Sequence, residues 1–199
     1  MNAEALIRQY YQPGTLAYEV MMRHAEQVTQ AALDVAERAV ALHPDRKFIE
    51  EAAMLHDIGI FYTDAPPIGC FGKRPYVCHG YLGRTLLESQ GLPAHALVCE
   101  RHIGVGLAAA DIATQNLPLP VRDMVPETLE EQIICFADNF FSKIPAPQGT
   151  IHTADAVAAS LARFGRDKVG IFCQWLARFG EPSCETTHTR AAIKADAPD

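Results

Sequence analysis

Apolar residues recur every three or four positions along most of the chain, which is the spacing of one face of an α-helix. The longest such run covers residues 15–42, is rich in alanine and ends at the sequence His-Pro-Asp. No segment alternates apolar and polar residues convincingly with a period of two. The pattern therefore predicts an all-α fold, a bundle of helices with at most a small hairpin.

Capping residues and glycines divide this pattern into separate helices. Asp45 is a good helix N-cap, and Gly59 follows the end of the helix that Asp45 begins. Residues 60–77 are rich in proline and glycine and are predicted to form a long loop, a feature that is more often functional than idle. The expected helices cover residues 3–11, 15–42, 45–57, 78–90, 93–103, 107–114, 126–143, 153–164 and 166–179.

The length of 199 residues suits one sizeable domain. We expect a single helical domain over residues 1–185, closed by two helices within 153–180. Residues 186–199 have little apolar surface to bury and are expected to form a disordered tail.

Composition narrows the class of protein. Hydrophobic residues make up 49% of the chain and charged residues 21%, with no apolar run long enough to span a membrane and no signal-like N-terminus. A cytoplasmic protein without a membrane partner is therefore expected. The net charge is −7 and no basic cluster occurs, so a nucleic-acid polymer is not expected as a partner. A small anionic substrate is compatible with this net charge if cationic side chains gather at its binding site. The sequence leaves open whether the chain forms a homo-oligomer.

The stretch EAAMLHDIGIF places His56 and Asp57 side by side at the end of an apolar helical run. Burying both groups without partners is costly, because both lose hydration. A metal ion would offset this cost by pairing with the carboxylate and the imidazole. Two ligands do not hold a metal, so others must come from elsewhere in the chain.

Further candidate ligands also stand beside apolar residues. Any one of these histidines alone is more often structural, but together with carboxylates they suit Fe, Mn, Co, Ni or Zn. The candidates are His24, His79, His102 and Asp138.

The order of these residues resembles that of the HD-domain metal-dependent phosphohydrolases. The stretches AAMLHDIG and CFADNFFSK match the two most characteristic segments of that family, and the resemblance covers residues 15–145. It implies the HD-domain helical bundle, with a metal held by His24, His56, Asp57 and Asp138. His56 and Asp57 would be the catalytic pair.

Two additional histidines resemble those of the family branch that holds two metals. The resemblance implies that Asp57 bridges two divalent transition metals and that His79 and His102 hold the second. Two departures weaken a likeness to the cyclic-dinucleotide hydrolases of this branch. Ile60 replaces a frequent lysine after the motif, and neither a further histidine nor a Gly-Tyr-Pro signature is evident.

The resemblance predicts a metal-dependent phosphohydrolase, in which metal-activated water attacks a small phosphate ester or anhydride, such as a nucleotide or dinucleotide. Cationic side chains near the motifs are candidates to bind the phosphate-containing substrate. They are Lys73, Arg74, Arg101 and Lys143.

Two alternatives use the same ligands. Some HD-fold proteins hold two irons and activate oxygen, so a di-iron oxygenase is the second hypothesis. A non-catalytic nucleotide-binding sensor is the third, although such a binder has no need of all six ligands.

Cys99 and Cys135 each stand three residues before a proposed ligand, His102 and Asp138 respectively. This spacing places each thiol on a neighbouring face of the helix. We expect both cysteines to pack beside the metal site rather than to coordinate it.

Overall fold

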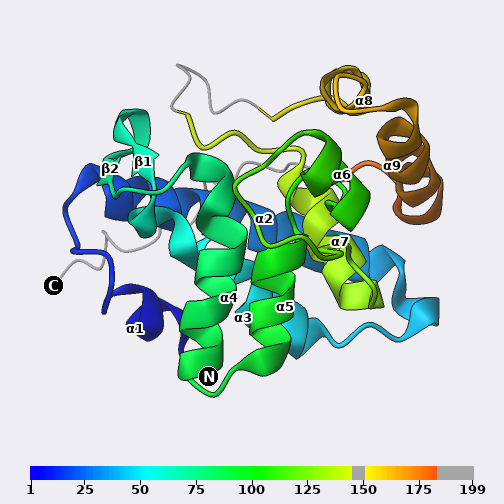
Figure 1. Cartoon of the computed structure of the whole chain (residues 1–199). Coiled ribbons are helices and arrows are strands. Elements are labelled where there is room, and N and C mark those ends of the chain that lie inside the picture. The colour runs from blue at the N-terminus through cyan, green and yellow to red at the C-terminus, as the bar shows by residue number, and fades with distance from the viewer. Residues whose placement is uncertain (145–150, 183–199) are drawn as a thin grey trace, which may run out of the picture.

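The computed structural model describes residues 1–144 and 151–182, and Figure 1 shows that helices are the main regular structure of this part of the chain, joined by loops. The all-helical expectation is confirmed. The α-helices are α1 (Ala3–Ile7), α2 (Leu16–Arg38), α3 (Arg46–Leu55), α4 (His79–Ser89), α5 (Pro93–Arg101), α6 (Ala109–Thr114), α7 (Leu129–Asp138), α8 (Ala154–Leu161) and α9 (Arg166–Phe179).

Several helices begin at a side chain that caps the first turn. Asn2, Thr15, Asp45 and Thr153 each accept a hydrogen bond from the backbone N–H three residues later. Thr128 does the same at α7. The carboxylate of Glu131, the third residue of this helix, accepts a hydrogen bond from the backbone N–H of Thr128, which completes a capping box. Local sequence therefore sets where these helices start.

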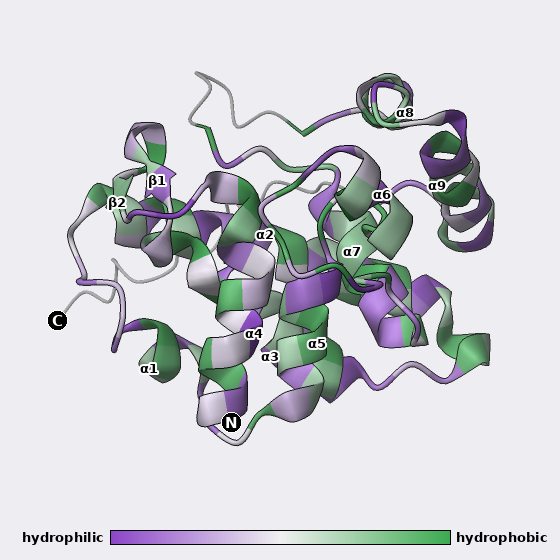
Figure 2. Ribbon diagram, in the orientation of Figure 1, coloured by the Kyte–Doolittle hydropathy of each residue, from purple (hydrophilic) through white to green (hydrophobic). Residues whose placement is uncertain are grey.

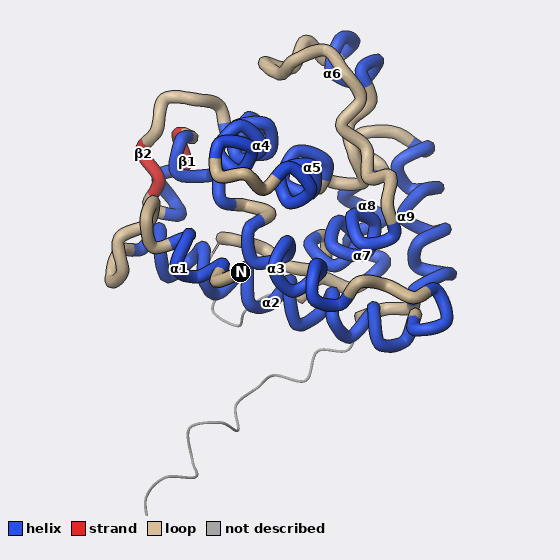
Figure 3. The backbone as a smooth tube through the Cα atoms, turned by 90° about the horizontal axis from the view of Figure 1, so that it is seen from below, coloured by secondary structure: helices blue, strands red, loops and turns tan. Residues whose placement is uncertain are grey.

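The helices pack around one long central element. α2 contacts α3 and α7, while α5 contacts α3, α4 and α7. Figures 1 and 3 show α4 and α5 side by side, away from α1 and α2, with α8 and α9 gathered at the α7 end. Both helices α4 and α5 carry hydrophilic and hydrophobic residues in Figure 2, as half-buried helices do.

The largest apolar cluster lies where α2, α3, α7 and α9 meet. Val35, Ile49, Phe136 and Phe172 are all 0% exposed within it. The rings of Phe136 and Phe172 lie 5.6 Å apart between their centroids. This close-packed core fixes the position of α7 relative to α2.

The predicted loop at residues 60–77 has more local order than expected. It begins within the 3-10 helix η2 (Ile58–Tyr62) and contains the antiparallel strands β1 (Asp64–Ala65) and β2 (Cys70–Phe71), which Figure 3 shows in red. The 3-10 helices η3 (Pro66–Ile68) and η4 (Tyr76–Cys78) complete the segment. The small hairpin is the only sheet in the described part of the chain.

Three helices, α1, α2 and α7, end well before the predicted residue. α1 stops at Ile7, where the prediction ran to residue 11. α2 stops at Arg38 and is followed by the 3-10 helix η1 (Val40–Leu42), after which His43 adopts a left-handed φ of 55°. Pro44 disfavours the right-handed helical conformation at His43, so no helix continues past this point. α7 stops at Asp138 instead of continuing to residue 143.

Among the described residues, none of the helices has the length and hydropathy needed to cross a membrane. The predicted tail, residues 186–199, lies outside the described residues. The boundary of a single domain at residue 185 and the cytoplasmic location stay predictions.

Candidate metal centre

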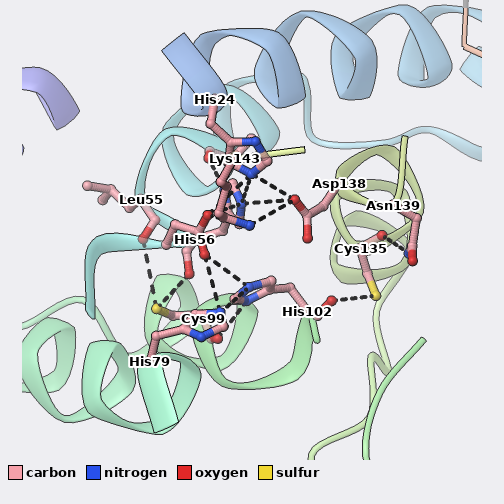
Figure 4. A network of polar contacts seen from close by, with 12 residues as sticks. His24, Leu55, His56, His79, Cys99, His102, Cys135, Asp138, Asn139 and Lys143 are labelled. Atoms are coloured by element: carbon pink, nitrogen blue, oxygen red, sulfur yellow. Dashed lines mark hydrogen bonds and ion pairs between the residues drawn. The ribbon is translucent and has the colours of Figure 1, made fainter. Parts of the chain in front are cut away.

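Six side chains from different parts of the sequence converge at the centre of the helical bundle (Figure 4). Most stand at helix ends, where a side chain can point across the gap between helices. They are His24 inside α2, His56 and Asp57 after α3, His79 at the start of α4, His102 after α5 and Asp138 at the end of α7.

The first group consists of His24, His56, Asp57 and Asp138. The Nε2 atoms of His24 and His56 lie 3.3 Å apart, and each is 3.2 Å from Asp57 Oδ2. Asp138 Oδ1 lies 2.8 Å from His24 Nε2 and 3.4 Å from His56 Nε2. Four ligand atoms thus surround one small space, as a metal site requires.

The second group consists of Asp57, His79 and His102. The Nε2 atoms of the two histidines lie 3.1 Å apart, and each is 3.3 Å from Asp57 Oδ1. The two oxygens of Asp57 therefore face different groups. This geometry agrees with the predicted bridging position of Asp57.

Three of the histidines are oriented by backbone carbonyls three residues earlier. The Nδ1 atoms of His56, His79 and His102 lie 2.6, 2.7 and 2.8 Å from the carbonyl oxygens of their respective partners. An Nδ1–H that donates to a carbonyl leaves the Nε2 lone pair directed at the centre, which is the form that binds a metal. The partners are Ala53, Tyr76 and Cys99.

The donor set fits divalent metals better than it fits a metal-free core. His56, Asp57 and His102 are at most 2% exposed. The buried oxygen Oδ2 of Asp57 faces imidazole nitrogens at 3.2 Å and the ammonium of Lys143 at 2.8 Å, so this carboxylate is surrounded by cationic or metal-binding groups. The Nε2 atoms of His79 and His102 face each other at 3.1 Å, while each Nδ1 lies against a backbone carbonyl oxygen. A proton on each Nδ1 would leave two Nε2 lone pairs face to face. A cation between them would satisfy each lone pair.

Burial and neighbouring charges shift the pKa values of the acidic groups and of the imidazoles in this cluster in different directions. Burial would raise the pKa of Asp57 and Asp138, but Lys143 and the neighbouring histidines outweigh it and hold both well below the usual range. Burial lowers the pKa of His79 to about 3, so this imidazole is neutral. Burial also lowers the pKa of His56, yet Asp57 and Asp138 prevail and raise it to about 10. A metal that binds His56 therefore displaces a proton.

Two glycines allow α4 to approach the His-Asp turn closely. A Cβ atom on Gly59 would lie 2.3 Å from the carbonyl oxygen of His79 and 2.4 Å from the backbone nitrogen of Gly83. Neither distance is tolerable for a carbon atom. Glycine at position 59 therefore brings His79 within reach of Asp57.

A cavity of about 570 Å³ opens beside the first ligand group. Asp138 and Lys143 line it on the metal side, and Val157 and Leu161 of α8 form part of its apolar wall. Sequence reasoning missed this wall, because α8 lies far from the motifs along the chain and carries no polar signal. Only the tertiary packing places it opposite the ligands.

The predicted substrate residues occupy different surroundings. Lys143 Nζ lies 2.8 Å from Asp57 Oδ2 and lines the cavity. Arg101 points to Glu131 and Glu127, at 3.0 and 3.1 Å. Lys73 and Arg74 follow β2 and are exposed, outside the residues that line the cavity. The structure therefore brings together the six predicted ligands and Lys143, and a substrate role for any of the four cations stays a prediction.

Buried thiols lie against the ligand turns, as the spacing predicted. Cys99 and Cys135 are both 0% exposed, and burial raises the pKa of each thiol well above its usual value. Neither belongs to the two ligand groups found among the described residues.

Comparison of the structure with solved structures supports the fold. The HD domain of the L. monocytogenes phosphodiesterase PgpH, solved with cyclic-di-AMP, superposes with a TM-score of 0.50 at 15% identity, over 88% of this chain and 94% of that domain. The chain therefore has an all-α fold similar to that of this HD domain, with a candidate metal centre at its middle. No family model matches the sequence.

Sequence relatives give the family. "Uncharacterized protein MJ0778" of Methanocaldococcus jannaschii is 32% identical over 127 residues, which are 62% of this chain and 68% of that protein. The chain belongs to the family of this protein, whose name states no activity.

Two further relatives carry a named activity. A tRNA (cytidine(56)-2'-O)-methyltransferase of Picrophilus torridus is 32% identical over 127 residues, and one of Thermoplasma volcanium is 28% identical over the same length. Each match covers 63% of this chain and 33% of the methyltransferase. The chain thus spans only about a third of the length of these relatives.

These relatives contradict the predicted phosphohydrolase. Their name describes the transfer of a methyl group to tRNA, not the hydrolysis of a phosphate ester or anhydride. The predicted function and enzyme class are therefore wrong, and the names give no support to the oxygenase or sensor alternatives. The physical reason is that a set of His and Asp ligands determines that a metal binds but does not determine the reaction.

The expected exclusion of nucleic acid is weakened as well, because the name of these relatives includes tRNA. The conflict is limited, since the matched segment is a minor part of each methyltransferase.

Proposed function

We propose that this chain is a two-metal HD domain that serves tRNA modification by binding a phosphate-bearing nucleotide unit. Methyl transfer itself is assigned to the part of the methyltransferases that this chain does not match. The observation that carries the proposal is the 127-residue match to two tRNA methyltransferases, on a chain that brings six His and Asp side chains into one cluster.

The ligand geometry supports two metals per chain. Asp57 presents one oxygen to each group, so a single carboxylate can bridge two cations. Fe, Mn, Co, Ni and Zn all suit imidazole and carboxylate ligands. When bound, these ions supply concentrated positive charge and can polarise a phosphoryl oxygen.

The cavity supports a ligand of limited size. Its volume of about 570 Å³ lies within the range of small-molecule sites. Lys143 stands at its inner end, where an ammonium can pair with a phosphate oxygen. The domain of similar fold from L. monocytogenes was solved with cyclic-di-AMP, a phosphate-containing ligand. Lys73, Arg74 and Arg101 remain candidates to contact parts of the ligand outside the cavity.

The overall charge supports recognition of one unit rather than a long stretch of backbone. A net charge of −7 repels a polyanion over most of the surface. Bound metals and Lys143 would make the local charge positive at the metal centre alone. A tRNA end or an extruded nucleotide is therefore the form of RNA that this site suits.

The experiment measures binding of tRNA to the chain in its metal-free and Mn²⁺-loaded forms, by fluorescence anisotropy at physiological salt. We expect binding that requires the metal and that cyclic-di-AMP or a mononucleotide displaces. His56→Ala should abolish it, whereas Lys47→Ala should not change it, because Lys47 is exposed and belongs to neither ligand group. Equal binding with and without metal, or no binding at all, would refute the proposal.

A second measurement tests the division of labour. The metal-loaded chain is incubated with tRNA and radiolabelled S-adenosylmethionine. We expect no transfer of label by the chain alone. Transfer by the chain alone would show that the methyl-transfer site lies within it, contrary to the proposal.

A further inference from the structure

Two of the metal-ligating histidines occupy the same position in different helices. His56 is the residue that follows the end of α3, and His102 is the residue that follows the end of α5. The last carbonyls of a helix have no partner inside that helix. His56 and His102 are buried, so their carbonyl oxygens need a donor from another element.

For His56 that donor is a thiol of the neighbouring helix. Cys99 Sγ on α5 lies 2.9 Å from the carbonyl oxygen of His56 and 3.8 Å from that of Leu55, as Figure 4 shows. The backbone carbonyl of Cys99 in turn accepts from Nδ1 of His102, at 2.8 Å. Cys99 therefore contacts one histidine of each ligand group, with its side chain and its backbone respectively.

For His102 the same arrangement occurs between α5 and α7. Cys135 Sγ on α7 lies 3.2 Å from the carbonyl oxygen of His102 and 3.3 Å from that of Gly104. Figure 4 shows this sulfur facing His102. The thiol on α5 thus supports the end of α3, and the thiol on α7 supports the end of α5.

We infer that Cys99 and Cys135 are positioning residues, whose S–H donors hold the helix-end histidines of the two metal groups separately. The Cys99 thiol fixes His56 and so acts on the four-ligand group. The Cys135 thiol fixes His102 and so acts on the three-ligand group. Because each histidine ring is oriented through its own turn, a shift of that turn moves the Nε2 lone pair away from the centre.

A thiol suits this task for a physical reason. It is a weak donor with a largely apolar surface, so it can be buried among hydrophobic residues at little cost. A serine hydroxyl of similar size keeps the donor, whereas an alanine methyl removes it. The pair of substitutions therefore separates the hydrogen bond from the packing.

The experiment measures Zn²⁺ affinity by competition with a chromophoric chelator, starting from metal-free protein. His79→Ala is used as a second background, in which only the four-ligand group remains intact. Cys99→Ala should weaken the four-ligand group by about tenfold, the range seen when groups that orient a ligand are lost. Cys135→Ala should weaken the three-ligand group similarly and leave the four-ligand group unchanged.

Matched variants control for packing. Val98→Ala on α5 and Ile134→Val on α7 remove buried apolar volume next to each cysteine in the sequence without removing a donor. They should leave both affinities near those of the unchanged protein. Cys99→Ser and Cys135→Ser should recover most of the lost affinity, and circular dichroism confirms that each variant is folded.

The inference is overturned by any of three results. The alanine variants could behave like Val98→Ala and Ile134→Val, the two alanine variants could weaken both groups equally, or the serine variants could fail to recover affinity while folded. Each result would assign the thiols to packing alone. None of these measurements depends on tRNA, so the outcome is independent of the proposed function.

Discussion

The ammonium of Lys143 lies 2.8 Å from Oδ2 of Asp57. The same oxygen is 3.2 Å from Nε2 of both His24 and His56, so it belongs to the four-ligand group. A cation of the chain thus stands beside an oxygen that a metal would use. Since like charges repel, Lys143 and a bound metal oppose each other, while both attract an anionic ligand.

Replacing Lys143 with methionine should therefore have two effects of opposite sign. The affinity of the four-ligand group for Zn²⁺ should rise by about tenfold, because a repulsive charge is removed from a buried site. The affinity of the metal-loaded chain for a mononucleotide should fall, because an ammonium no longer meets the phosphate. Chelator competition measures the first change and fluorescence anisotropy the second.

Lys73→Met is the control for this prediction, since Lys73 is exposed and does not line the cavity. It should leave Zn²⁺ affinity unchanged. If Lys143→Met lowered the affinity for Zn²⁺, the lysine would be supporting the ligands rather than opposing the metal.

The position of Asp57 between the two ligand groups predicts the metal content of variants. Asp57→Ala should lose both metals, because one oxygen is removed from each group. His79→Ala should lose only the metal of the three-ligand group. Elemental analysis of protein refolded with excess Mn²⁺ and then desalted gives the number of metals per chain. Two metals retained by folded Asp57→Ala would contradict the bridging position.

The sequence pointed to all six residues of this cluster, because each would be costly to bury without a partner and because their order resembles that of a known family. His56 and Asp57 stood in an apolar run, where each would be costly without a partner. The four other ligands shared that setting, and all six converge in the structure. Helix starts were similarly local, since Asp45 and Thr128 cap their helices with their own side chains.

What the sequence did not reveal depends on contacts between distant segments. The wall that α8 contributes to the cavity follows from its packing against α9, which in turn contacts α7, and no local pattern encodes this arrangement. The early end of α7 at Asp138 places Lys143 in a turn rather than on the helix. The reaction class was predicted wrongly, because identical ligands serve different chemistries in the same fold.

The close contact at Gly59 predicts a large loss of stability for Gly59→Ala. The added Cβ would meet backbone atoms of His79 and Gly83, which cannot move aside as a flexible side chain can. We expect a loss of about 2–3 kcal/mol in the free energy of unfolding, typical of overpacking in a core. Urea denaturation of metal-free protein measures it.

Gly170→Ala is the matched control for this prediction. Gly170 lies within α9 and an added Cβ would have nothing within 4 Å. Alanine there should stabilise the helix by about 0.5–1 kcal/mol, because glycine loses more backbone freedom on folding. Equal effects of the two substitutions would show that the approach of α4 to the turn is not as tight as the distances imply.

The ion pair between Lys168 and Asp111 predicts how stability depends on pH. Lys168 is 6% exposed, and its ammonium lies 2.5 Å from Asp111 Oδ2 and 3.1 Å from the carbonyl oxygen of Gly106. The hydrogen bond from Lys168 lowers the pKa of Asp111 below its ordinary value of 3.8, although burial opposes this. The pair joins α9 to α6 and, through Gly106, to the loop after His102.

A carboxylate whose pKa is lowered by folding binds its proton less readily in the folded state than in the unfolded state. Its contribution to stability is therefore fully present above the ordinary pKa near 3.8 and is lost as the pH falls through the lower folded pKa. Asp111→Asn should cost about 1 kcal/mol at pH 7, a value reduced for the partial exposure of this carboxylate. The difference from the unchanged protein should shrink as the pH falls below 4, a threshold of about the ordinary pKa of an aspartate. Urea denaturation at a series of pH values measures it, with the exposed Asp155→Asn as the control. A difference that stayed constant down to the lowest pH would show that the ion pair does not carry the effect.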